Sequence, residues 1–148
     1  MKSLFEVSAY KEVLNRLDQL TEDSQRKWGK MSVGQMVWHC QVPLEVAVKN
    51  KPNSGKNGNP LVRWFFKKSL YNDKPWRKGL PTSPIAKATE EKDFQTEMTN
   101  LKSLVHACYE TRERKEWQPH PLFGHLTHDQ WGMMEYKHLD HHLRQFGV

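Results

Sequence analysis

Apolar residues recur at spacings of three and four along most of the chain, and polar residues fill the positions between them. Near the N-terminus Tyr10, Val13 and Leu17 follow this spacing, which predicts an amphipathic helix over residues 5–20. No stretch of the sequence shows the alternation of period two that is typical of a half-buried strand. The pattern therefore predicts an all-α protein.

Two short polar motifs indicate where helices begin. Ser32 is followed three residues later by Gln35, and Thr127 by Gln130. At this spacing the two side chains satisfy free backbone N–H groups at the start of a helix. The first motif predicts a second helix that runs to about position 50, and the other predicts a last helix that Gly147 ends.

The middle of the chain is more irregular. After the second helix the sequence predicts a loop rich in Gly, Asn and Pro, and then a short helix over residues 61–70 that presents Trp64 and Phe65. A third long helix, over residues 90–115, is expected to begin at Thr89. The whole chain is thus predicted to be one domain, a four-helix bundle with a long crossover connection between the second and third helices.

Length and composition support a soluble globular protein. The 148 residues include six tryptophans, and aromatic residues make up 11% of the chain, so the sequence can form a packed core. No apolar run reaches the roughly 20 residues that cross a bilayer, and the N-terminus lacks the apolar stretch of a signal peptide. Cys40 and Cys108 both lie in apolar helical patterns, which favours a reducing, cytoplasmic location.

Positive charge is concentrated in residues 51–88, which contain nine Lys or Arg and a single acid. Such a segment can attract phosphates, anionic substrates or acidic partners, although a solvated loop is the simpler interpretation. Trp64, Phe65, Phe66 and Trp76 lie among these cations and could stack on single-stranded bases. The absence of a helix-turn-helix pattern disfavours nucleic acid as a partner, and core packing of the aromatics is favoured.

Histidines on the last helix are the main candidates for chemistry. His138 and His142 are one turn apart on the same face and lie at the centre of the apolar stripe. Buried imidazoles are costly unless their nitrogens are satisfied, either by hydrogen bonds within the core or by a divalent cation. Neutral imidazole is a good ligand for zinc, nickel, copper or iron.

A third histidine strengthens this hypothesis. His39 lies in the apolar arc of the second helix, where it would face His138 and His142 across a bundle. Three histidine ligands with open coordination positions are the arrangement that catalytic metal sites require. His141 is a competing ligand at the edge of the stripe, and Cys40 is interpreted as core packing.

Two polar residues beside these histidines are candidates for supporting the ligands or for catalysis. Glu135 lies one turn before His138, and a surface salt bridge is its alternative role. Gln145 lies one turn after His142, and a hydrogen bond at the helix end is its alternative role. Asp140, on the opposite side of the helix, is expected to face water.

The remaining histidines are assigned other roles. His120 is expected to shape the start of the last helix, with a place at the mouth of a pocket as the alternative. His125 and His128 flank that helix start and are expected to face solvent, and His106 lies off the central stripe of the third helix.

Three segments together resemble the DinB/YfiT-like superfamily, in a branch described only as a domain of unknown function. These are VGQMVWHC around His39, HPLFG, and the terminal YKHLDHHLRQFG, which supplies the most specific match through His138, His142 and Gln145. The similarity runs from about Leu14 to Gly147 and is loose over the basic segment.

This resemblance implies a four-helix bundle with an up-down-down-up arrangement and a divalent metal, zinc or nickel, held by His39, His138 and His142. Characterised members of the superfamily include transferases and isomerases that use low-molecular-weight thiols such as mycothiol, bacillithiol or glutathione. Many members are homodimers.

Three functions are consistent with the sequence. The first is a metal-dependent S-transferase or isomerase acting on a small molecule with a thiol, and the second is a metal-dependent hydrolase that uses a metal-bound hydroxide. A requirement for a thiol in turnover distinguishes them. The third is a non-catalytic binding module that uses the basic region 51–88, for which salt-sensitive binding of single-stranded DNA is the test.

Overall fold

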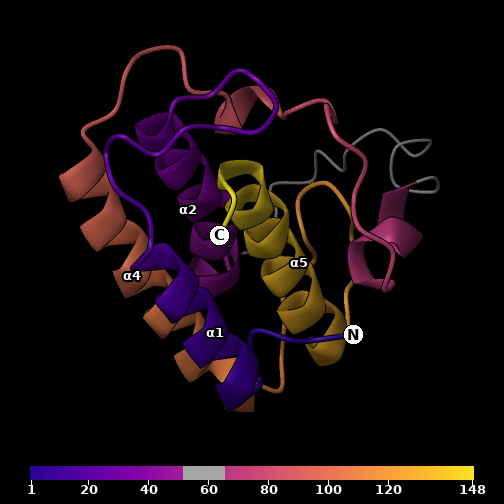
Figure 1. Ribbon diagram of the computed structural model, residues 1–148. Coiled ribbons are helices and arrows are strands. Elements are labelled where there is room, and N and C mark those ends of the chain that lie inside the picture. The colour runs from indigo at the N-terminus through magenta and orange to yellow at the C-terminus, as the bar shows by residue number, and fades with distance from the viewer. Residues whose placement is uncertain (52–65) are drawn as a thin grey trace.

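The computed structural model describes residues 1–51 and 66–148, and every helix or strand assigned in these two ranges is a helix. The α-helices are α1 (Val7–Leu17), α2 (Val33–Lys49), α4 (Phe94–Glu110) and α5 (His128–Phe146), and the short 3-10 helices are η1 (Lys67–Tyr71), η2 (Pro84–Ala86) and η3 (Thr111–Glu113). Figure 1 shows the α-helices side by side. The prediction of an all-α fold is confirmed for the described ranges.

The helices enclose one apolar core. Helix α2 packs against α4 and α5, and α1 packs against α4 and α5 (Figure 1). The largest fully buried apolar side chains come from all four helices and include Leu17, Met36, Leu44, Leu101, Trp131, Leu139 and Leu143. Shortening one such leucine to alanine typically costs about 2–5 kcal/mol of stability. None of the helices in the described ranges is long and apolar enough to cross a membrane.

The predicted helix caps are present. The Ser32 hydroxyl accepts the backbone N–H of Gln35, whose side-chain oxygen in turn accepts the N–H of Ser32. Thr127 and Gln130 form the same pair at the start of α5. Helix α5 ends at Gly147, whose φ of 87° lies in the left-handed region that favours glycine.

Other predicted boundaries were wrong. Helix α4 begins at Phe94 and not near Thr89, because the Asp93 carboxylate accepts the backbone N–H of Thr96 at 2.8 Å and caps the helix there. It ends at Glu110 and passes into η3, and α1 is shorter than the predicted 5–20.

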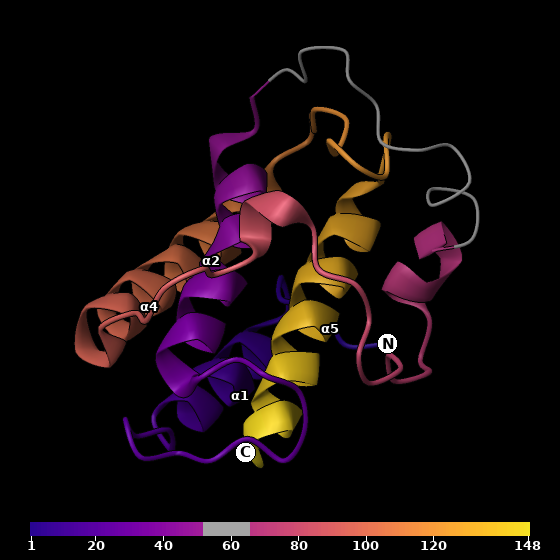
Figure 2. The ribbon, with the colours of Figure 1, turned by 90° about the horizontal axis from the view of Figure 1, so that it is seen from above.

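The predicted short helix over residues 61–70 falls partly outside the described residues, as do Trp64 and Phe65. The described part of this stretch contains the start of η1, a 3-10 helix, and Leu70 is buried against the core. The rest of the connection crosses the helices before α4 begins. Figure 2 shows this segment running beside α5 after η1 and then lying across α2 at η2, before the chain reaches α4.

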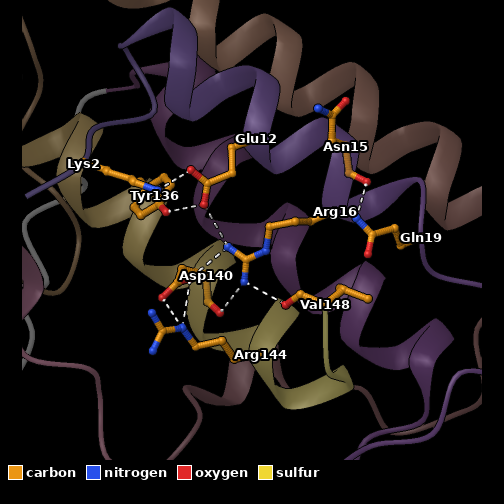
Figure 3. Close-up of polar contacts among 9 residues, drawn as sticks. All are labelled: Lys2, Glu12, Asn15, Arg16, Gln19, Tyr136, Asp140, Arg144 and Val148. Atoms are coloured by element: carbon orange, nitrogen blue, oxygen red, sulfur yellow. Dashed lines mark hydrogen bonds and ion pairs between the residues drawn. The ribbon is translucent and has the colours of Figure 1, made fainter.

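A charged network joins α1 to α5 (Figure 3). The Arg16 guanidinium donates to Asp140 Oδ1 at 2.8 Å and to the backbone oxygen of Val148 at 2.9 Å, and Arg144 pairs with the same carboxylate at 2.9 Å. Asp140 was predicted to face water, but its side chain is only 16% exposed because two guanidiniums enclose it. The prediction failed because Arg16 lies on another helix, far away in the sequence.

The same network continues toward the start of α1. Tyr136 donates its hydroxyl proton to Glu12 at 2.9 Å, and Lys2 pairs with the other oxygen of this carboxylate (Figure 3). Hydrogen bonds to charged groups contribute about 1.5–3 kcal/mol each when they are shielded from water. The α1–α5 contact is therefore held by partnered charges as well as by apolar packing.

Candidate metal centre

Three imidazoles from two helices meet inside the bundle. His39 comes from α2, and His138 and His142 come from successive turns of α5. One ring nitrogen of each lies within 4.8 Å of the other two, and the three residues could hold a metal ion. The Nε2 atoms of His39 and His138 are 3.0 Å apart, and His39 and His142 are buried. The three histidines predicted from the sequence therefore do come together.

The outer nitrogens of two of these rings are held by oxygen atoms. His39 Nδ1 lies 2.7 Å from the backbone oxygen of Ala86, and His142 Nδ1 lies 2.9 Å from Gln145 Oε1. A carbonyl oxygen only accepts, so each Nδ1 carries the hydrogen. In a neutral ring Nε2 then carries the lone pair, and for both residues it is the nitrogen that could bind a metal.

Gln145 is itself fixed by the connection between α1 and α2. Its amide nitrogen donates to the backbone oxygen of Trp28 at 2.8 Å, which settles which amide atom faces His142. Gly29 allows this approach, because a Cβ atom there would lie 2.3 Å from the Gln145 nitrogen, and its φ of 83° also favours glycine. Gln145 thus contacts the candidate ligand His142, as expected of a supporting residue, and its other hydrogen bond goes to the connection between α1 and α2.

His138 and Glu135 are less well satisfied. His138 Nδ1 is buried and has no hydrogen-bond partner in the described residues. Glu135, one turn earlier on α5, is 0% exposed, and neither of its carboxyl oxygens has a described partner. The alternative of a surface salt bridge for Glu135 was therefore wrong. A buried polar atom without a partner typically costs about 1–3 kcal/mol.

Burial also determines the charge of these groups. Burial lowers the pKa of all three histidines: that of His39 falls, that of His138 falls well below its usual value, and that of His142 falls to about 3. For His138 and His142, the neighbouring histidines lower the pKa further. Burial raises the pKa of Glu135 to about 8. At neutral pH the rings are therefore neutral, the form that binds metals, and most of Glu135 is protonated.

Other histidines are occupied elsewhere. His120 is buried, and its Nδ1 accepts the backbone N–H groups of Leu122 and Phe123 at 3.0 and 3.3 Å, so it shapes the turn before α5. His128 is half-exposed, so it faces solvent in part, and its Nε2 lies 2.6 Å from the backbone oxygen of Arg112. His125 is exposed, as predicted.

The two cysteines are packing residues, as predicted for Cys40. Both are buried, and burial raises the pKa of each thiol. The Cys40 sulfur contacts Met36 one turn earlier on α2, at 3.7 Å. Neither belongs to the histidine cluster.

Sequence analysis missed three parts of this site. Ala86 contributes only a backbone oxygen, Trp28 does the same, and Gly29 contributes only the space it leaves. No side-chain pattern indicates such roles. All three lie in connections between helices, where periodicity gives no information.

Fold and site together define an all-helical protein with a candidate metal centre of three neutral histidines. The chain belongs to the family described as "Protein of unknown function (DUF1569)", whose model matches residues 2–147. Searches with the chain matched no curated protein and no solved structure.

Proposed function

We propose that the protein is a metal-dependent enzyme that binds a divalent cation, zinc or nickel, through His39, His138 and His142 and acts on a small-molecule thiol. The observation that carries this proposal is the convergence of three neutral imidazoles in the interior, two of them with the outer nitrogen already donating to an oxygen. This donor set fits a transition metal, for which nitrogen ligands and supporting outer hydrogen bonds are typical.

The chain's own residues prepare the site. The Ala86 carbonyl and the Gln145 amide orient the rings of His39 and His142, and the surrounding apolar side chains keep water from the buried faces of these rings. A divalent cation bound here supplies Lewis acidity, which lowers the pKa of a thiol or a water molecule. Three protein ligands leave positions for a substrate group.

The thiol has to come from the substrate. Cys40 and Cys108 are buried, and the pKa of each is raised, so neither presents a thiolate at neutral pH. A low-molecular-weight thiol satisfies this condition if it loses its proton and its sulfur forms a bond to the electrophilic carbon, while the bond from that carbon to its leaving group or epoxide oxygen breaks. The proposed activity is therefore that of a thiol-dependent S-transferase or isomerase.

The proposal extends to the architecture. We assign the four α-helices to the up-down-down-up arrangement of DinB-like bundles, supported by the all-helical fold and by the motifs around His39 and His142. A homodimer is part of the same proposal. Sedimentation analysis of the purified protein tests the dimer separately from the chemistry.

The test is thiol consumption by protein loaded with zinc or nickel, with a panel of small thiols and alkyl or epoxide electrophiles. We expect metal-dependent loss of thiol that His142→Ala abolishes and that His125→Ala, a change at an exposed histidine, leaves intact. Hydrolysis of ester or amide substrates without any thiol would instead favour a metal-dependent hydrolase. Neither activity in protein shown to hold metal would contradict the enzymatic proposal.

A further inference from the structure

A cavity of about 320 Å³ lies beside the candidate metal centre. Parts of the chain that are far apart in sequence enclose it: the N-terminal residues, the connection between α1 and α2, the segment after η1, and one face of α5. Its volume is within the usual range for sites that bind small molecules.

Two aromatic residues of the cavity wall contact the candidate ligands. The Trp76 ring centre is 5.9 Å from that of His138, and the ring centre of His141 is 5.0 Å from that of His142. Trp76 and His141 also contact each other, at 5.8 Å between ring centres. Trp76 and His141 therefore line the cavity and at the same time contact two of the candidate ligands, so the cavity adjoins the histidine cluster.

Positive side chains dominate the lining. Five cations face the cavity, namely Lys2, Lys74, Lys78, Lys137 and Arg144, against two acids, Asp73 and Asp140. A concave surface with an excess of one charge raises the local concentration of oppositely charged ligands.

Three of these cations are engaged within the protein. Lys137 donates to the backbone oxygens of Ser69 and Asn72 at 2.6 and 2.7 Å, and thereby ties η1 to α5. Lys2 pairs with Glu12, and Arg144 pairs with Asp140. These interactions hold the wall of the cavity in place, and those of Lys2 and Arg144 are drawn in Figure 3.

The other two cations have no acidic partner in the described residues. Lys74 and Lys78 are both exposed, and the Lys78 ammonium lies 4.5 Å from the centre of the Trp28 ring. A cation over an aromatic face keeps its capacity to donate hydrogen bonds to an anion. Lys74 and Lys78 are thus available to bind the anionic group of a ligand.

We propose that this cavity binds the carboxylate or phosphate group of the small molecule on which the metal centre acts, through Lys74 and Lys78. Trp28 and Trp76 would pack against the uncharged part of the ligand, whose reactive end points toward the histidines. The statement that this ligand is the substrate of the metal centre rests on the proposed function. Anion binding by Lys74 and Lys78 does not depend on the metal.

The test uses the full chain after removal of metal, so that chelation does not interfere. Citrate and inorganic pyrophosphate are titrated separately at constant ionic strength, with tryptophan fluorescence and calorimetry as readouts. The variant Lys74→Ala/Lys78→Ala removes both cations, and Lys11→Ala/Lys49→Ala is the matched control, because it removes the same charge from exposed positions outside the cavity.

We expect one or both probes to bind, at least about tenfold more weakly to the cavity variant, and within about twofold of wild type to the control. The tighter probe indicates whether a carboxylate or a phosphate is recognised. Absence of binding to both probes, or equal weakening in the two variants, would overturn the proposal. Lysine-dependent binding of a single-stranded oligonucleotide without binding of either probe would also overturn it. A zinc titration of the same samples reports on the metal centre separately.

Discussion

The two sides of helix α5 handle polar groups in opposite ways. Toward α1, Tyr136 and Asp140 meet charged partners, and the carboxylate of Asp140 receives two guanidiniums (Figure 3). Toward α2, Glu135 and His138 are buried with atoms that have no described partner, and burial raises the pKa of Glu135 and lowers that of His138. The first side uses polar groups to hold the fold, and the second carries unpartnered polar atoms beside three histidines that could hold a metal ion.

The energetic cost of the unpartnered atoms supports this difference between the two sides of α5. An unpartnered buried polar atom costs about 1–3 kcal/mol, and a whole domain is stable by only about 5–15 kcal/mol. The unpartnered atoms of Glu135 and His138 therefore represent a large destabilisation if nothing binds nearby. A cation shared by the three histidines would bind at their Nε2 atoms, so its stabilisation would come from the new metal–nitrogen bonds and would fall on this side of α5 alone.

The largest expected effect is stabilisation by zinc. At a free concentration about 1,000 times Kd, one bound ion adds roughly 4 kcal/mol to the free energy of unfolding. For a chain of this length that raises Tm by about 8–16 °C. Scanning calorimetry with zinc and then with a chelator checks it. An equal rise in His142→Ala would place the zinc elsewhere on the protein.

Arg16→Ala tests the other side of the helix. It removes a guanidinium that is 14% exposed and leaves Asp140, which is 16% exposed, with Arg144 alone, so we expect a loss of about 2–3 kcal/mol in urea unfolding. Zinc affinity should stay within about twofold of wild type, since the network makes no contact with the rings. Lys49→Ala, which removes an exposed ion pair, is the control, and its expected cost is below about 1 kcal/mol.

Gln145→Leu removes the hydrogen bond to Nδ1 of the candidate ligand His142. Without the oxygen that holds His142 Nδ1, zinc affinity should fall by about 10–100-fold. Gln145→Glu keeps an acceptor at that position and should bind zinc more tightly than the leucine variant. If the two variants are equally impaired in competition titrations, Gln145 acts only by holding the Trp28 connection.

The smallest effect concerns pH and Glu135. Folding raises the pKa of Glu135 from 4.5 to about 8. Between pH 4.5 and 8 the folded protein therefore binds a proton that the unfolded chain does not, and the contribution of Glu135 to stability falls as pH rises. The slope for a fully coupled proton is about 1.4 kcal/mol per pH unit. In metal-free protein, Glu135→Gln should reduce the decrease in the free energy of unfolding between about pH 6.5 and 8. This pH range is chosen because it lies above the range in which the buried histidines titrate. Parallel profiles for variant and wild type would show that Glu135 is ionised in the folded state.

Much of the site could be predicted because it follows helical periodicity. The positions of His39, His138 and His142 on apolar stripes were sufficient to place them together, and Ser32 and Thr127 marked the helix starts correctly. In contrast, the pairing of Asp140 with Arg16 joins residues 124 positions apart, and periodicity indicates only which face a residue occupies. The support given by Ala86, Trp28 and Gly29 comes from backbone atoms in connections, which leave no side-chain pattern.

The most direct test of the account is the metal content of protein purified without added metal, measured by mass spectrometry together with a zinc titration. We expect about one divalent ion per chain, in purified or zinc-titrated protein, and loss of this binding in His138→Ala. Protein that binds no divalent ion in either measurement, or that binds zinc equally well after His138→Ala, would contradict it.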